Sequence, residues 1–137
     1  MRSEALGMKN LKLSFDLILS SPYVRARQTA GIVAQAYKIK DRAIHYTENL
    51  LPPATIEELL DEAHASFPGS QNILLVGHEP YLTEMISSLL DCRQPLGIEL
   101  KKGGLCCLSI RYPLKKNSAI LNWLLTPAQL HLLDPSL

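Results

Sequence analysis

The sequence has little that would mark a disulfide scaffold, a secreted protein or a membrane protein. Only three of its 137 residues are cysteines, Cys92, Cys106 and Cys107, and an odd number with two adjacent members argues against a disulfide framework. No uncharged apolar run approaches the roughly 20 residues that a membrane span needs, and the stretch Met1–Glu4 lacks the apolar core of a signal peptide. We therefore expect a cytoplasmic protein without a membrane partner.

An excess of one charge and the common cofactor motifs are also absent. The chain has 14 Lys and Arg against 13 Asp and Glu, a net charge of +1, and only the pairs Lys101-Lys102 and Lys115-Lys116 stand out, so we expect no nucleic-acid partner. There is no Gly-x-Gly-x-x-Gly, no Walker sequence and no His-x-x-x-His pair, and Cys106-Cys107 is not a zinc pattern. We expect neither a metal nor another cofactor.

What the chain does contain is a strand–turn–helix pattern that occurs twice. The first unit starts with the short apolar stretch at residues 15–19, after which Ser21 can cap a helix with Pro22 at its first position. The second starts with the apolar residues 73–76 and turns sharply at Gly77-His78 into another helix. Two such units favour an α/β fold, a three-layer α/β/α sandwich with a mostly parallel sheet.

The length is that of one ordinary domain, and we expect residues 1–137 to form it. The remaining expected elements are a helix over residues 2–13, a short strand at 43–46, a helix over 55–67, and two strands, 103–112 and 118–126, in a hairpin that turns near 113–117.

Arg25 lies close to the start of the first unit's helix, the end whose positive dipole favours anions rather than cations. The carboxyl ends of parallel strands meet at one edge of a sheet, so Ser21 and Arg25 should lie near His78 and Glu79. A phosphate bound there would accept hydrogen bonds from backbone N–H groups, Arg25 and His78. The two turns together therefore predict a phosphoryl-binding site.

Ordinary interpretations compete with this one. An arginine near a helix start is commonly solvated, as we expect for Arg27, and a lone histidine after a strand is often a turn residue. We expect structural or solvated roles for the other three histidines, His45, His64 and His131.

Three stretches resemble, in order and spacing, the SixA-type phosphohistidine phosphatases of the histidine phosphatase (phosphoglycerate mutase-like) superfamily. They are DLILSSPYVRARQTAGIVA at residues 16–34, ILLVGHEPYLTEMISSLL at 73–90 and NWLLTPAQL at 122–130. The resemblance covers about residues 3–132. It implies a phosphoglycerate mutase-like sandwich and a phosphate pocket of two arginines and two histidines, one histidine being the nucleophile.

The resemblance also implies roles for single residues. Arg25, in RARQTA, matches a phosphate-binding arginine, and His78, in VGHEP, matches the second, charge-stabilising catalytic histidine. Ser21 would shape the phosphate-binding turn. Glu48, in TENLLPP, lies where the mutase branch places a carboxylic acid proton donor, and Glu79 is a further candidate for an acid or a supporting residue.

One part of the family pattern is missing. The nucleophile of the family lies in an Arg-His-Gly motif at the end of the first, central strand, and this sequence contains no Arg-His-Gly. The opening RSEALGMKNLKL looks like the middle of the helix after that strand. We therefore expect an N-terminally incomplete domain that lacks this strand, the nucleophile and one phosphate arginine, and loss of a nucleophile removes most of the rate.

The function implied is that of a phosphohistidine phosphatase acting on a phosphorelay or phosphotransfer protein through a phosphohistidine enzyme intermediate. Two alternatives remain open: a non-catalytic module that binds phosphate or phosphohistidine, and an acid phosphatase of broader specificity in the same superfamily. A sheet without its central strand would have open edges, which predicts dimerisation through an exposed edge.

Overall fold

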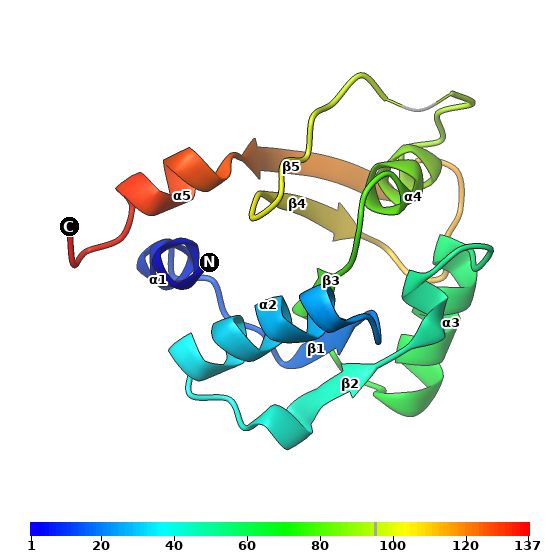
Figure 1. The fold of residues 1–137 in the computed structure, drawn as a ribbon. Coiled ribbons are helices and arrows are strands. Elements are labelled where there is room, and N and C mark those ends of the chain that lie inside the picture. Colours follow the sequence, from blue (N-terminus) through cyan, green and yellow to red (C-terminus); the bar gives the residue numbers. More distant parts are fainter. Residues whose placement is uncertain (95) are drawn as a thin grey trace.

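The fold is built on a sheet of three parallel strands, seen in a computed structural model that describes residues 1–94 and 96–137. β1 (Leu17–Ser20) is the central strand, with β2 (Ile44–Tyr46) on one side and β3 (Ile73–Val76) on the other (Figure 1). β1 and β3 pair in register over their whole length of four residues. Their short apolar sequences are typical of strands that are covered on both faces.

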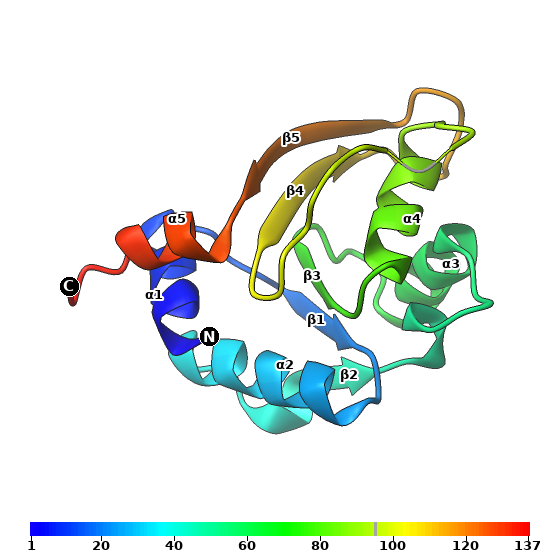
Figure 2. The ribbon, with the colours of Figure 1, turned by 45° about the horizontal axis from the view of Figure 1, so that its top comes forward.

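The expected C-terminal hairpin is confirmed, and it forms a sheet of its own. β4 (Leu105–Ile110) and β5 (Ala119–Leu125) pair antiparallel, with an irregularity between Cys107 and Leu108. Figure 2 shows this ribbon curving over the parallel sheet beside it. The parallel strands expected from the sequence are thus all in the first sheet, and the antiparallel hairpin forms a separate sheet of two strands.

Helices cover both faces of the parallel sheet. The α-helices of the described residues are α1 (Arg2–Asn10), α2 (Val24–Ala36), α3 (Ile56–Ser66), α4 (Tyr81–Leu89) and α5 (Pro127–Leu132), and the 3-10 helices are η1 (Asp41–Ala43) and η2 (Glu48–Leu50). None of these helices is long and apolar enough to cross a membrane.

Alternation along β1 divides the core into two layers. Ile18 is buried among residues of α1, α2 and α5, whereas Leu17 and Leu19 are buried among residues of α3 and α4. Successive side chains of a strand point to opposite faces of the sheet, so each face has its own apolar core. The three-layer α/β/α sandwich expected from the sequence is confirmed.

Two helix boundaries differ from the sequence prediction. α2 begins at Val24 with Tyr23 as its N-cap, so the prediction that Ser21 is the N-cap and Pro22 the first helical residue was wrong by two positions. The Ser21 hydroxyl accepts a hydrogen bond from the Tyr23 N–H instead, over 3.1 Å, which closes a turn before the helix. α1 ends at Asn10, because Lys12 adopts a left-handed φ of 60° that no α-helix continues.

α5 was not predicted, although the sequence contains its start signal. Thr126 and Gln129 form a capping box in which each side chain accepts from the other residue's backbone N–H, and Pro127 occupies the first helical position. The helix packs directly against α1. An added Cβ at Gly7 would lie 2.0 Å from the Leu130 carbonyl oxygen, so only glycine allows the two backbones to approach so closely.

We expect Gly7→Ala to lower the free energy of unfolding by about 1–3 kcal/mol, because the new methyl group pushes α5 away from α1. The matched control is Gly31→Ala, in α2, where an added Cβ meets no atom within 4 Å. This control should raise the free energy of unfolding by about 0.5–1 kcal/mol, since alanine is the better helix former. Urea denaturation followed by circular dichroism measures both, and equal changes would contradict the proposed close contact.

Candidate functional site

The carboxyl ends of β1 and β3 meet at one edge of the sheet, as the sequence predicts. The Ser21 N–H, directly after β1, donates to the carbonyl oxygen of Val76, the last residue of β3, over 2.9 Å. The Ser21 side chain is completely buried. The turn after β1 is therefore tied to the end of β3, and the residues that follow both strands lie side by side.

A hydrogen bond joins the two turns through their side chains. Ser21 Oγ lies 2.8 Å from His78 Nε2, and the same Oγ accepts from the Tyr23 N–H. When the Ser21 hydroxyl donates to Nε2, the proton of a neutral His78 ring is on Nδ1. The bond to Ser21 thus fixes the ring at Nε2, and with the hydroxyl as the donor Nδ1–H is the remaining ring donor for a ligand.

Two further contacts hold His78 in position. Its ring centroid lies 5.3 Å from that of Tyr23, and its carbonyl oxygen accepts the Leu82 N–H in the first turn of α4 over 2.9 Å. The side chain is half-buried. His78 is therefore held by both strand–turn–helix units, and one part of its ring stays accessible.

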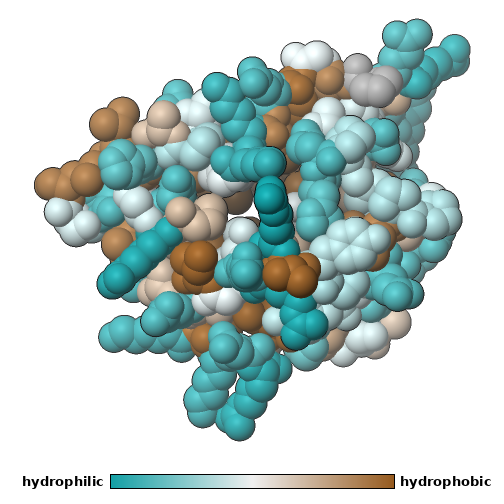
Figure 3. All heavy atoms as spheres, viewed as in Figure 1, coloured by the Kyte–Doolittle hydropathy of each residue, from teal (hydrophilic) through white to brown (hydrophobic). Residues whose placement is uncertain are grey.

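Arg25, His78 and Glu79 line one cavity of about 400 Å³. Arg25 is the second residue of α2, and its exposed side chain approaches the cavity from the helix start. Apolar residues that include Val33 and Leu74 form part of the wall. Figure 3 shows that the face around this region is mainly hydrophilic, with hydrophobic atoms visible between the polar side chains.

The two acidic candidates lie in different places. Glu79 borders the cavity, but its carboxylate accepts hydrogen bonds from the N–H of Thr83, over 2.8 Å, and from the Thr83 hydroxyl. Glu48 begins η2 and lines a second pocket together with residues 49 and 51–54 and Glu58. The structure does not bring Glu48 to the cavity of Arg25 and His78.

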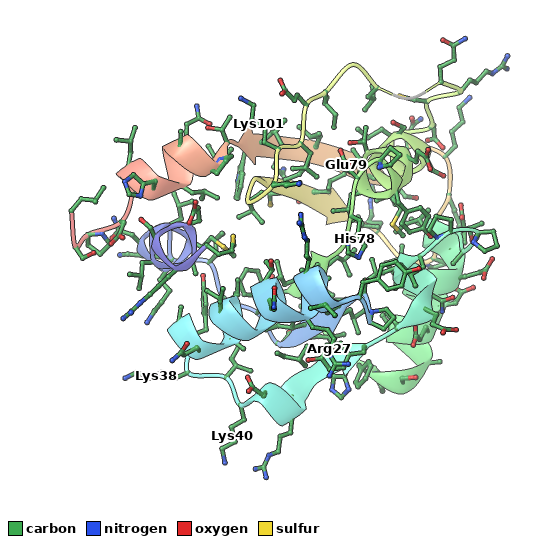
Figure 4. All side chains as sticks on the ribbon, in the orientation of Figure 1. Arg27, Lys38, Lys40, His78, Glu79 and Lys101 are labelled. Atoms are coloured by element: carbon green, nitrogen blue, oxygen red, sulfur yellow. The ribbon has the colours of Figure 1, made fainter. Side chains whose placement is uncertain are left out.

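Arg27 points away from this cavity. Its guanidinium lies 4.5 Å from the ring centroid of Tyr46 in β2, a distance at which a cation and an aromatic face attract each other. Figure 4 shows Arg27 on the β2 side of α2, across from His78 and Glu79. The two arginines in this turn of the helix therefore have different neighbours. Arg25 lines the cavity of the candidate site, whereas Arg27 contacts Tyr46.

The other histidines also have surroundings of their own. The His45 ring lies 4.3 Å from that of Phe67, and the His64 ring is stacked on Tyr112 at 4.5 Å. His131 Nδ1 lies 2.6 Å from Ser3 Oγ. None of these three histidines lines the cavity, and within residues 1–94 and 96–137 no three His, Cys, Asp or Glu side chains gather in a way that would hold a metal ion.

The structure adds two residues that the sequence did not assign to the site. Lys101 and Lys102 line the same cavity as Arg25 and His78, from the segment that leads into β4. Their signal in the sequence is a basic pair followed by Gly103-Gly104, which is typical of a turn. The sequence alone does not show which strand ends this turn approaches.

The chain thus has an α/β fold in which three parallel strands lie between two helical layers, with Ser21, Arg25 and His78 beyond the strand ends. Two solved structures share it. The protein histidine phosphatase SixA complexed with tungstate superposes with a TM-score of 0.75 over 94% of this chain and 80% of that chain, at 19% identity. The Agrobacterium tumefaciens protein assigned as a phosphohistidine phosphatase SixA gives a TM-score of 0.62 over 91% and 80%, at 27% identity.

Two curated proteins are similar to the chain in sequence. A phosphohistidine phosphatase SixA homolog of Haemophilus influenzae is 31% identical over 85 residues, 61% of this chain and 52% of that protein. An uncharacterised protein of Picosynechococcus is 32% identical over 103 residues, 74% of this chain and 61% of that protein. No family model matches the chain. In sequence the chain is similar to a SixA homolog and in fold to SixA structures, and it spans about half to three fifths of the length of the two sequence relatives.

We predict that Ser21→Ala changes the state of the His78 ring. Without the serine hydroxyl, Nε2 loses its hydrogen-bond partner, and with Ser21 as the donor in wild type the neutral ring shifts toward the Nε2–H form. Long-range ¹H–¹⁵N NMR spectra of the imidazole nitrogens measure this change.

The same variant leaves the Tyr23 N–H without its acceptor, so we expect the free energy of unfolding to fall by about 1–3 kcal/mol. Ser109→Ala is the control, because its hydroxyl donates to Asn122 on the exposed hairpin. If the His78 spectrum were the same in wild type and Ser21→Ala, Ser21 would not be orienting the ring.

Proposed function

We propose that the cavity binds the phosphoryl group of a phosphohistidine on a partner protein, and that the chain serves the hydrolysis of that group. The main support is the hydrogen bond between Ser21 Oγ and His78 Nε2, which joins the ends of two parallel strands beside Arg25. The homology to SixA proteins favours phosphohistidine as the substrate class.

Arg25 and His78 would share the phosphoryl oxygens, with Ser21 behind them outside the cavity lining. Arg25 can donate two parallel hydrogen bonds to a phosphoryl group, a strong and geometrically specific arrangement. His78 Nδ1–H would donate to another oxygen, with Ser21 holding the ring. In an in-line displacement at phosphorus, negative charge lies on the equatorial oxygens, and fixed donors around them stabilise the transition state.

Neither acidic candidate is required for this substrate. The leaving group of a phosphohistidine is an imidazole, which depends less on a strong general acid than an alkoxide does. The place of Glu48 outside the cavity and the bonds of Glu79 to Thr83 are therefore compatible with phosphohistidine, and they argue against the acid phosphatase of broader specificity.

The nucleophile is the open part of the mechanism. The sequence has no Arg-His-Gly, and the three histidines other than His78 do not line the cavity. In this proposal the 137 residues would supply binding and charge stabilisation, whereas turnover by a covalent route needs a nucleophilic histidine in addition. This observation favours a second candidate function, a module that binds phosphohistidine without hydrolysing it.

The test of the pocket is a matched pair of arginine variants. We expect Arg25→Ala to weaken binding of phosphoramidate by at least tenfold, since a hydrogen bond to a charged group contributes about 1.5–3 kcal/mol. Arg27→Ala should leave binding close to wild type, because Arg27 contacts Tyr46 instead. Isothermal titration calorimetry or ³¹P line broadening measures both constants.

The same protein samples also distinguish the phosphatase from the binding module, by whether phosphate is released. Release of phosphate from phosphoramidate by wild type, lost in Arg25→Ala, would establish a phosphatase, whereas Arg25-dependent binding without release would establish the module. A preference for phosphoserine would favour the acid phosphatase. No binding, or equal loss in both arginine variants, would overturn the phosphoryl pocket.

We further propose that the chain pairs with a second copy through an open sheet edge. Among the described strands, β2 and β3 each pair only with β1 and so form the two edges of the parallel sheet, and unpaired strand edges favour association. Light scattering over a range of protein concentrations should show a dimer that forms reversibly. A constant monomer mass with a cooperative thermal transition would contradict this proposal.

The three cysteines, Cys92, Cys106 and Cys107, are free thiols in the structure. A reducing compartment maintains thiols in that state, and we propose the cytoplasm as the place where this chain acts.

A further inference from the structure

The two lysines at the cavity belong to a well-defined turn. The Gly104 N–H donates to the Lys101 carbonyl oxygen over 2.8 Å, and Gly103 has a φ of +80°. A bond from the fourth residue to the first, with glycine at positive φ in the third position, is a type II arrangement. Lys101 and Lys102 therefore occupy the first two positions of a tight turn.

Contacts with two helix starts hold this turn in place. A Cβ added to Gly103 would lie 3.4 Å from Pro127 Cβ and 3.5 Å from Met1 Sδ, so the turn lies against the starts of α5 and α1. Figures 1 and 2 both show the segment before β4 reaching toward α1 and α2. The two lysines are exposed and stand on a fixed part of the cavity rim.

The charges at the rim are not balanced. Arg25, Lys101 and Lys102 line the cavity, and within the described parts of the chain none of them pairs with a carboxylate. The one acidic residue on the lining, Glu79, has its carboxylate bound by Thr83. Arg25 with His78 supplies hydrogen-bond donors for one phosphoryl group, so the two exposed lysines can pair with acidic groups of the partner beside it.

We propose that Lys101 and Lys102 bind carboxylates of the partner protein next to its phosphorylated residue, and so select phosphohistidines in acidic surroundings. The inference rests on the proposed function, because it places the lysines beside the phosphoryl group held by Arg25. A protein rather than a nucleic acid is the favoured partner, since the net charge is only +1 and the lysine pair is confined to one turn.

The experiment compares two peptides that carry the same non-hydrolysable phosphohistidine analogue, one flanked by glutamates and one by alanines. Exposed ion pairs each contribute a fraction of a kcal/mol to about 1 kcal/mol, so wild type should bind the acidic peptide about 3- to 10-fold more tightly at low salt. Fluorescence anisotropy measures the ratio, and it should decrease toward 1 at about 1 M salt, where screening is strong.

The variant K101Q/K102Q should bring the ratio close to 1. The control K115Q/K116Q removes the same charges from exposed positions at the opposite end of the β4–β5 hairpin and should keep the wild-type ratio. Equal losses in the two variants would show a general charge effect and overturn the specific role of the turn.

The outcomes distinguish this proposal from the one on which it rests. Arg25-dependent binding of both peptides with a ratio of 1 would overturn the lysine proposal alone. Absence of binding by either peptide would overturn both proposals. A single-stranded oligonucleotide that binds at the same affinity as the acidic peptide, and loses it in K101Q/K102Q, would identify a nucleic acid as the partner instead and overturn the choice of a protein.

Discussion

The in-register parallel pairing of β1 with β3 is the constraint on which the site depends. Because both strands run in the same direction and end at the same level, Ser21 and His78 follow them at one edge of the sheet. A shift of one residue would move every side chain of a strand to the opposite face. The pairing thus sets the two apolar cores, and it also brings Ser21 Oγ within 2.8 Å of His78 Nε2.

The sequence predicted the layers better than the boundaries. A short, wholly apolar run such as residues 73–76 must be covered on both faces. It is therefore readily predicted as a buried strand between two helical layers. The start of α2 depends on the hydrogen-bond partners of Ser21. Its hydroxyl is buried and bonds to His78 and to the Tyr23 N–H, so Ser21 lies in a turn before the helix. His78, one of these partners, is 57 positions away in the sequence, so a local sequence pattern does not reveal the contact.

For the site, sequence reasoning identified the residues that directly follow the strands. Arg25 and His78 do line one cavity, and Ser21 bonds to His78. The lysine turn was not assigned, because it comes before an antiparallel strand of the second sheet and reaches the cavity only through tertiary packing. Glu48 shows the reverse case, in which a matching motif lies beside a different pocket.

The contact between α1 and α5 also bears on how the chain folds. Ser3 Oγ lies 2.6 Å from His131 Nδ1 and donates to Asp134 over 2.7 Å, and 128 positions separate Ser3 from His131. Closing such a loop costs about 2 kcal/mol more chain entropy than closing one of roughly ten residues. The contact between the two end helices therefore has a higher entropic cost than any contact within one strand–turn–helix unit, and such non-local contacts are the ones that slow folding.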